Sequence, residues 1–255
     1  MPHQIVTIPC LSDNYAFLVH DASTGATALV DAPEPGPILA ELSARNWQLT
    51  HVLLTHHHWD HVDGLADILA AHPAQVIGAS ADAHRLPHLD LALAEGDSFE
   101  FAGETVSIID VSGHTVGHIA FHFPDTQAVF TGDSLMAMGC GRLFEGTPAQ
   151  MFASLSKLAA LPDTTTVCSG HEYTASNCAF AASLAEDNPA LASRILEVDA
   201  LRAEGKFTVP SNLGIEKATN PFLRSHEPAL KAAIGMADAP AELVFTEIRK
   251  RKDNF

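Results

Sequence analysis

The chain lacks an apolar run long enough to cross a bilayer, and its N-terminus lacks the basic and hydrophobic regions of a signal peptide. Its 255 residues include only 4 cysteines, and none of them stands in a C-x-x-C pair. These absences argue against a membrane protein and against a secreted disulfide framework. We therefore expect a cytoplasmic protein with free thiols and no membrane partner.

Positive charge is also scarce over most of the chain. Residues 1–170 contain 4 Lys and Arg against 19 Asp and Glu, and the formal net charge of the whole chain is −17. An acidic surface repels nucleic-acid phosphates, so nucleic acid is not an expected partner. The basic residues gather in the last third, where Arg249–Lys252 form one run. By itself, such a run is typical of a solvated tail.

Histidine, by contrast, is abundant, with 15 copies, and seven consecutive residues concentrate it. Residues 55–61 read Thr-His-His-His-Trp-Asp-His, which contains the pattern H-x-H-x-D-H. Imidazole and carboxylate are ligands for zinc and related borderline metals. An apolar, β-branched segment precedes the run, and a segment with helical spacing follows it. The run is therefore predicted to lie on a strand-to-helix turn, where side chains can converge on one point.

Strands and helices are expected to alternate along the first two thirds of the chain. Thr147 before Pro148 has the pattern of a helix N-cap followed by a first helical proline. Strand signals stop near residue 172, so we expect a two-sheet α/β domain over residues 1–172 and a mostly helical domain over 173–255. The expected strands are 4–9, 15–20, 26–31, 50–55, 75–79, 98–101, 105–111, 119–123, 128–131 and 165–169, and the expected helices are 37–45, 64–72, 148–160, 174–185 and 189–204.

Three later segments share one arrangement: an expected strand ends, and a glycine then precedes a His or an Asp. The residues are His114, Asp133 and His171. Glycine suits a tight turn and close approach of the backbone, and strand ends at one edge of a sheet are common places for sites. We therefore count these three residues with the His-rich run.

The candidate ligands then number seven, whereas one zinc takes about four. Seven ligands with one bridging carboxylate suit two metals, although the sequence alone does not fix which ligand binds which ion. His57, His118 and Asp31 are expected to support the ligands or the fold. We group His56, His58 and His114 on one metal and Asp60, His61 and His171 on the other, with Asp133 as the bridge.

Taken together, these residues resemble the metallo-β-lactamase superfamily and, within it, the glyoxalase II family of hydroxyacylglutathione hydrolases. The H-x-H-x-D-H pattern is specific only to the superfamily, and three later segments narrow the resemblance to the family: Gly139–Thr147, His171–Thr174 and the basic tail. The whole set of matching segments is Asp13–Tyr15, His56–His61, Gly113–His118, Thr131–Asp133, Gly139–Thr147, His171–Thr174, Asn220–Arg224 and Arg249–Phe255.

The resemblance implies a four-layer αββα sandwich followed by a mostly helical C-terminal domain. It also implies two divalent metals in the grouping given above, zinc first, with iron or manganese as alternatives. The implied reaction is hydrolysis of S-D-lactoylglutathione to D-lactate and glutathione, the second step of methylglyoxal detoxification. A hydroxide bridging the two metals, held by Asp60 and Asp133, would attack the thioester carbonyl.

The resemblance also implies contacts to glutathione from Arg142, Tyr173, Arg249 and Lys252, which gives the basic tail a function. The sequence departs from some family members in two places. Arg142 replaces a Lys, and a guanidinium can hold a carboxylate with two hydrogen bonds. Phe144 replaces a Tyr, which removes a hydroxyl and predicts a weaker hold on glutathione with wider tolerance of other thioesters.

Three other classes of function are alternatives. A glutathione-persulfide dioxygenase would use a single iron. A β-lactamase would have no use for the basic tail, and the net charge opposes a nuclease. A metal-stabilised binding module without enzymatic activity needs fewer than seven ligands, since a structural zinc is four-coordinate. We expect a monomer acting on a glutathione thioester, and two metals per chain would separate the hydrolase from the dioxygenase.

Overall fold

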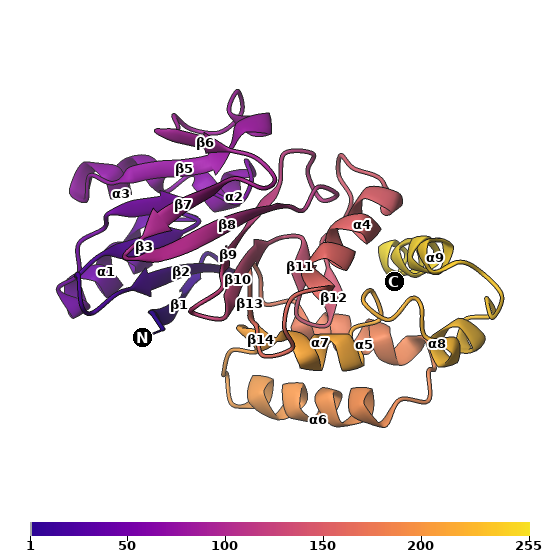
Figure 1. Ribbon diagram of the computed structural model, residues 1–255. Helices are drawn as coiled ribbons and strands as arrows, with labels where there is room; N and C mark the ends of the chain where they lie inside the picture. The colour runs from indigo at the N-terminus through magenta and orange to yellow at the C-terminus, as the bar shows by residue number, and fades with distance from the viewer. Residues whose placement is uncertain (1) are drawn as a thin grey trace. The chain divides into compact units, whose positions relative to one another are not determined.

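The computed structural model describes residues 2–255 and shows strands and helices alternating along the chain (Figure 1). Met1, the first residue of the predicted region 1–172, lies outside the described residues. The chain divides into two compact units. The first unit comprises the chain up to Val111 together with Val116–Gly132, and the second comprises Ser112–Thr115 together with Asp133–Phe255.

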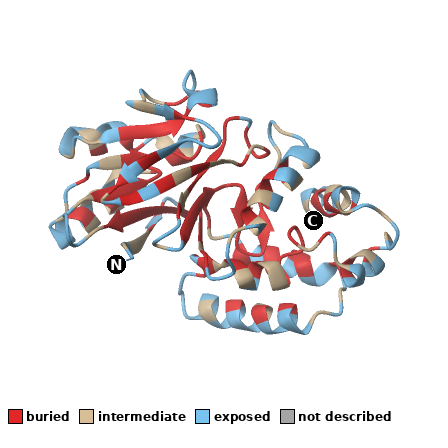
Figure 2. Ribbon diagram, in the orientation of Figure 1, coloured by how far each residue is buried: buried red, intermediate tan, exposed pale blue. Residues whose placement is uncertain are grey.

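Six strands form the first sheet of the first unit, in chain order from β1 to β6. The pairs from β1 to β3 are antiparallel, and those from β3 to β6 are parallel. Every residue of β2 and β3 is buried (Figure 2), as expected for strands with both faces covered. The bounds are β1 (Gln4–Cys10), β2 (Asn14–His20), β3 (Thr27–Val30), β4 (His51–Leu53), β5 (Gln75–Ala79) and β6 (Leu91–Leu93).

Helices connect the parallel strands, because two parallel neighbours cannot be joined by a tight hairpin. Helix α1 (Pro35–Arg45) joins β3 to β4 and ends at Asn46 in the left-handed conformation. Two short helices, α2 (Trp59–Val62) and α3 (Leu65–Ala71), join β4 to β5. The sequence predicts α3 but not α2, which is a single turn inside the His-rich run. A 3-10 turn, η1 (Ser80–Asp82), follows β5.

Four antiparallel strands of the first unit pack against the first sheet. Phe17 of β2 and Phe130 of β10 meet edge to face with their ring centroids 5.6 Å apart, and His51 of β4 meets Phe101 of β7 at 5.3 Å. Aromatic rings from both sheets thus fill the space between them. The bounds are β7 (Ser98–Phe101), β8 (Glu104–Asp110), β9 (Ile119–Phe123) and β10 (Ala128–Gly132), and neighbouring strands pair in chain order.

The second unit begins with a small hairpin and a capped helix. Strands β11 (Leu135–Met136) and β12 (Gly139–Cys140) pair antiparallel. Thr147 caps α4 (Pro148–Ala159) in a capping box with Gln150, which confirms the predicted start of this helix. Strand β13 (Thr166–Ser169) pairs with β14 (Ser211–Asn212). Strand β14 lies beyond residue 172, where the sequence gives no strand signal, because it is only two residues long.

The rest of the second unit is helical. The predicted helices 174–185 and 189–204 are present as α5 and α6, which pack on a core that includes Met138, Cys178 and Val198. The basic run is part of the last helix and not an irregular tail. The bounds are α5 (Thr174–Ser183), α6 (Pro189–Ala203), α7 (Leu213–Thr219), α8 (Pro228–Ala233) and α9 (Ala241–Asp253).

Two further properties concern the whole described chain. Within residues 2–255, the helices are too short or too polar to cross a membrane. The four cysteines carry free, buried thiols. Burial raises the pKa of Cys140 to about 11 and the pKa of Cys10 and Cys178 to about 12, which keeps these thiols protonated at neutral pH.

Candidate metal centre

The first unit contributes four of the predicted ligands from the turn between β4 and α3. His56 Nε2 lies 3.2 Å from His58 Nδ1, and His61 Nε2 lies 3.9 Å from the Oδ2 of Asp60. The rings of His56 and His61, both fully buried, have centroids 4.2 Å apart. The short helix α2 produces this convergence, because it brings Asp60 and His61 back toward the extended segment that carries His56 and His58.

A buried carboxylate, Asp31, lies behind two of these rings. Its Oδ2 accepts a hydrogen bond from His61 Nδ1 at 2.8 Å and another from the Thr55 hydroxyl at 2.8 Å. Because that hydroxyl donates to Asp31, it is left to accept from His56 Nδ1, which lies 3.0 Å away. Both histidines are thereby held in the tautomer in which Nε2 is unprotonated and can bind a metal. This contact agrees with the expectation that Asp31 supports the ligands.

Asn14 holds the carboxylate of the fourth ligand. Its side-chain amide donates to both the backbone carbonyl and the Oδ2 of Asp60, each at 3.0 Å. In the sequence, Asn14 stands out only as part of the matching segment Asp13–Tyr15, so this contact is not predicted. The structure reveals it, because the Asn14 amide is buried at the start of β2, where a solvated turn residue would be exposed.

The two extra histidines near the run have partners of their own in the first unit. His57 Nδ1 donates to Asp82 Oδ2 at 2.9 Å, which links the run to the turn η1. His118 stacks on His56 with ring centroids 4.5 Å apart. Gly132 is required beside them: its φ is +48°, and an added Cβ would lie 2.5 Å from the Thr55 hydroxyl oxygen and 2.7 Å from His118 Nε2.

The second unit contributes the other three predicted ligands, which come from three separate segments. His114 Nε2 lies 3.4 Å and His171 Nε2 3.2 Å from the same oxygen, Oδ2 of Asp133. All three side chains are buried. Both ring nitrogens are thus directed at one carboxylate oxygen.

The orientation of these two rings is also fixed. His114 Nδ1 donates to the backbone carbonyl of Arg142 at 2.7 Å, which leaves Nε2 directed at Asp133. His171 stacks on Tyr173 with an interplanar angle of 7°. As in the first unit, the outer nitrogen or the ring face is held by a neighbour, and the inner nitrogen is directed at the other ligands.

The predicted glutathione contacts differ in exposure. Arg142 and Tyr173 are exposed, and the Arg142 guanidinium lies 5.8 Å from the centroid of the exposed Phe144 ring. Arg249 is buried and donates to the Cys140 carbonyl at 3.1 Å and to Asp253 at 2.8 Å. Lys252 lies over the rings of Phe180 and Phe255, and its pKa is lowered by burial and by Arg249. Contact of these four side chains with glutathione stays a prediction.

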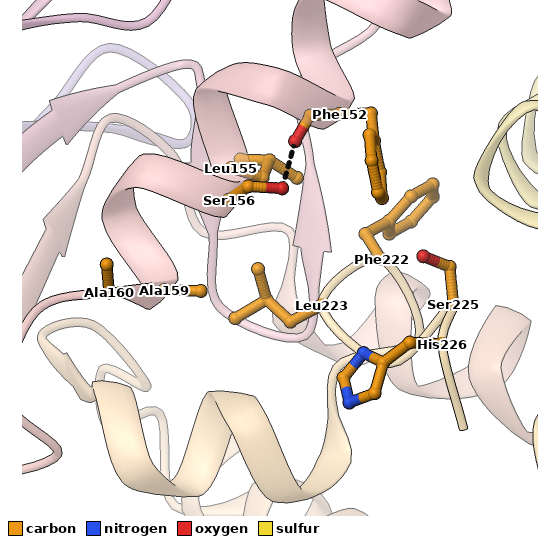
Figure 3. A pocket seen from close by; sticks show the side chains of 9 residues that line it. All are labelled: Phe152, Leu155, Ser156, Ala159, Ala160, Phe222, Leu223, Ser225 and His226. Atoms are coloured by element: carbon orange, nitrogen blue, oxygen red, sulfur yellow. Dashed lines mark hydrogen bonds between the residues drawn. The ribbon is translucent and has the colours of Figure 1, made fainter. Parts of the chain in front are cut away.

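A pocket elsewhere in the second unit is distinct from these ligands. It has a volume of about 310 Å³ and is formed by α4 and the segment 222–226. Figure 3 shows the side chains that line it, with Phe152 on α4 and with Phe222 and His226 on the segment 222–226. No predicted metal ligand lines it, and its walls are mainly apolar.

The donor set fits a metal. All seven predicted ligands belong to groups of His and Asp side chains that could hold an ion, among the residues that the structure describes. Imidazole nitrogens and carboxylate oxygens, with the outer ring nitrogens of His56, His61 and His114 already engaged, are the chemistry of a divalent metal site. The clusters support a divalent metal cofactor.

The two-sheet fold and the His and Asp donor set indicate a class of metal-dependent proteins. Comparison with known proteins supports this class. Residues 12–171 match the sequence model of the metallo-beta-lactamase superfamily. The structure is similar to that of the BLEG-1 B3 metallo-beta-lactamase, with a TM-score of 0.67 and 19% identity, covering 86% of this chain and 99% of that one. It is also similar to TTHA1623 in a di-iron-bound form, with a TM-score of 0.61 and 27% identity, covering 86% and 100%.

The rest of the chain narrows the class. Residues 172–255 match the model of the hydroxyacylglutathione hydrolase C-terminus. A hydroxyacylglutathione hydrolase of Ruegeria pomeroyi is 65% identical over the full length of both chains. The chain therefore belongs to the hydroxyacylglutathione hydrolase family, which confirms the predicted fold class. The comparisons do not favour the dioxygenase or the non-enzymatic binding module.

Proposed function

We propose that the chain is a thioester hydrolase that converts S-D-lactoylglutathione, or a related 2-hydroxyacylglutathione, to D-lactate and glutathione in the detoxification of methylglyoxal. The observation that carries the proposal is the 65% full-length identity to a relative named for this activity. The donor sets of the two units support it, because hydrolysis of a thioester at neutral pH needs an activated water.

We propose two divalent metals, zinc first and iron or manganese as alternatives. His56, His58 and His114 would hold one ion, Asp60, His61 and His171 would hold the other, and Asp133 would bridge them. The contacts of both His114 and His171 with one oxygen of Asp133 support the bridge. The di-iron form of TTHA1623 supports a binuclear site in a related fold. When bound, the cations supply a nucleophilic oxygen near neutral pH and polarise the carbonyl.

The residues of the chain then have separate tasks. Asp60, fixed by Asn14, would hold the attacking oxygen for its approach to the thioester carbon. Asp133 would hold the same oxygen. The glutathione thiolate leaves without help from a strong acid, because a thiol pKa is about 8.5. No further proton donor is needed for that step.

Substrate binding is assigned to the C-terminal part of the chain. Arg142, Arg249 and Lys252 would provide positive charge for the carboxylates of glutathione, and Tyr173 would add a hydrogen bond. In this proposal residues 1–172 are the catalytic domain and residues 173–255 the substrate-binding domain. The protein would act as a cytoplasmic monomer.

The test is steady-state kinetics of the zinc-loaded protein on S-D-lactoylglutathione, with detection of the released thiol. S-propionylglutathione, which lacks only the 2-hydroxyl, is the matched comparison substrate, and glutathione persulfide with oxygen tests the dioxygenase. We expect a higher kcat/KM for the lactoyl thioester than for the propionyl thioester and no oxygen uptake with the persulfide. Oxygen uptake without thioester cleavage would contradict the proposal.

A further inference from the structure

The hairpin β11–β12 lies between two functional positions of the second unit. Asp133 precedes it by two residues, and Arg142 follows it by two. Residues 135–140, which we call the hairpin segment, are all buried, and Met138 at its turn has a φ of +60°. A buried turn cannot satisfy its backbone polar groups with solvent, so they must find partners within the protein.

Side chains from the helical region form hydrogen bonds with backbone groups of five consecutive residues of this segment, 136–140. Asn220 Nδ2 donates to the carbonyls of Met136 and Gly139, at 3.1 and 3.0 Å. Asn177 Nδ2 donates to the Ala137 carbonyl at 3.1 Å, and Glu216 Oε2 accepts from the Met138 amide at 2.7 Å. Arg249 completes the series at the Cys140 carbonyl. We call Asn177, Glu216 and Asn220 the clamp.

The clamp is itself fixed. Glu216 and Asn220 are fully buried. Asn220 Nδ2 also lies 3.0 Å from Glu216 Oε2, so its two N–H groups are shared among three acceptors. The other carboxylate oxygen of Glu216 accepts from the Ser211 hydroxyl, and Asn220 Oδ1 accepts from the Phe222 amide at 3.0 Å. Side chains with this many partners have one conformation, so they can determine the position of the backbone that they hold.

Both ends of the hairpin segment lead directly to metal ligands. The Gly141 amide donates to the Ser134 carbonyl at 3.0 Å, and an added Cβ on Gly141 would lie 1.9 Å from the Asp133 carbonyl oxygen. The next carbonyl, that of Arg142, accepts the hydrogen bond that orients His114. A shift of the hairpin segment therefore moves Asp133 at one end and releases the His114 ring at the other.

We propose that Asn177, Glu216 and Asn220 are positioning residues for the hydrolysis, which hold the hairpin segment so that Asp133 and the Arg142 carbonyl keep the metal ligands of the second unit in place. This inference rests on the proposed function for its catalytic part. It gives the helical region a second task besides binding the substrate. Partners behind metal ligands typically change metal affinity by about 10–100-fold when they are removed.

The experiment compares three variants with a matched control. Asn220→Ala removes two of the contacts, and Glu216→Ala removes the contact to the Met138 amide. Glu216→Gln keeps an oxygen for that amide and presents an NH₂ to the Ser211 hydroxyl, so it tests rescue by a conservative change. The control is Asn188→Ala, which removes an amide donor to the Ala218 carbonyl of α7 and the N-cap of α6 but leaves every contact between the clamp and the hairpin segment in place.

Three readouts separate positioning from simple stability. These are the zinc affinity of the metal-free protein, hydrogen exchange of the peptide covering residues 133–142, and kcat and KM for the thioester. We expect Asn220→Ala and Glu216→Ala to weaken zinc binding about 10–100-fold, to speed exchange in that peptide and to lower kcat more than they raise KM. We expect Glu216→Gln and Asn188→Ala to match the wild type in all three.

The inference is overturned if Asn220→Ala and Glu216→Ala bind zinc and exchange as the Asn188→Ala control does. Should the two alanine variants fail to fold, Asn177→Ala, which removes a single contact, decides by the same readouts. Zinc affinity and hydrogen exchange do not depend on turnover. A wild-type protein that fails to cleave the thioester would therefore count against the proposed function and leave the test of the clamp intact.

Discussion

The two units supply their ligands in different ways. In the first unit, four of the proposed ligands come from six consecutive residues, His56–His61, and are supported by the side chains of Asp31 and Asn14. In the second unit, three proposed ligands come from segments about twenty to forty residues apart, and the ring of His114 is held by a backbone carbonyl. A local cluster needs support only behind its rings, whereas a dispersed set also needs the backbone of each contributing loop to be fixed. The clamp meets that second requirement.

The largest effect should come from the second unit. Asp133→Ala removes the proposed bridge, to which His114 and His171 both point. Because metal activation supplies several kcal/mol of transition-state stabilisation, kcat should fall about 10³-fold or more, and bound metal should fall with it. Elemental analysis beside the kinetics checks both. Retention of full metal content and turnover would remove the bridging role and, with it, the importance assigned to the dispersed set.

A smaller effect is expected from Asp31, whose carboxylate holds rings of the local cluster His56–His61. Asp31→Asn weakens the acceptor that fixes His61 directly and His56 through Thr55. Zinc affinity should fall about 10–100-fold, while the exchange rates of the 133–142 peptide stay those of the wild type. Competition with a zinc chelator measures the affinity. An unchanged affinity would mean that the local cluster needs no support.

The pH dependence of folding stability gives a further test of Glu216 in the clamp. Burial raises the pKa of Glu216 above its usual range. The folded state therefore binds this proton more tightly than the unfolded state, and stability is lost as pH rises from the unfolded pKa of about 4.3 through the folded pKa. Glu216→Gln should be more stable than the wild type at neutral pH by about 1 kcal/mol, and the difference should shrink toward acid. Denaturant unfolding at several pH values measures it; a difference that grows in acid would reverse the sign.

The smallest effect is expected where neither ligands nor clamp are touched. Thr147→Ala removes the capping box of α4, which should cost about 1 kcal/mol and lower the Tm by about 2–4 °C. Metal content and kcat should stay unchanged. Calorimetry with parallel kinetics checks this, and a loss of metal would show that the second unit is more tightly coupled than the clamp alone implies.

Much of the fold follows from the sequence. Helices α1 and α3 to α6 and all strands of the first unit except β6 are predicted from their patterns, and the Thr147 cap has a clear pattern. Strands β6, β11, β12 and β14 have two or three residues each, too few for any period, and helices α7 to α9 are predicted only as part of a mostly helical region. Helix α2 is a single turn within the His-rich run, where the proposed metal ligands hide the helical pattern.

The candidate site also has a part that the sequence predicts and a part that it does not. The seven ligands can be proposed from sequence because His and Asp follow strand ends in a recurring form. The residues that hold them cannot. Asn14 and Asn220 stand out only as parts of segments that match the family, and Asn177 and Glu216 look like ordinary polar positions of helices. Only the fold shows that the amides and carboxylate of the clamp face a buried backbone.

The number of metal ions that the wild-type protein holds tests the account most directly. Metal-free protein would be loaded with zinc, freed of excess by gel filtration and analysed for zinc and protein. The account predicts two zinc ions per chain, falling below two when Asp133 is replaced by Ala. A firm ratio of one, unchanged in that variant, would contradict it.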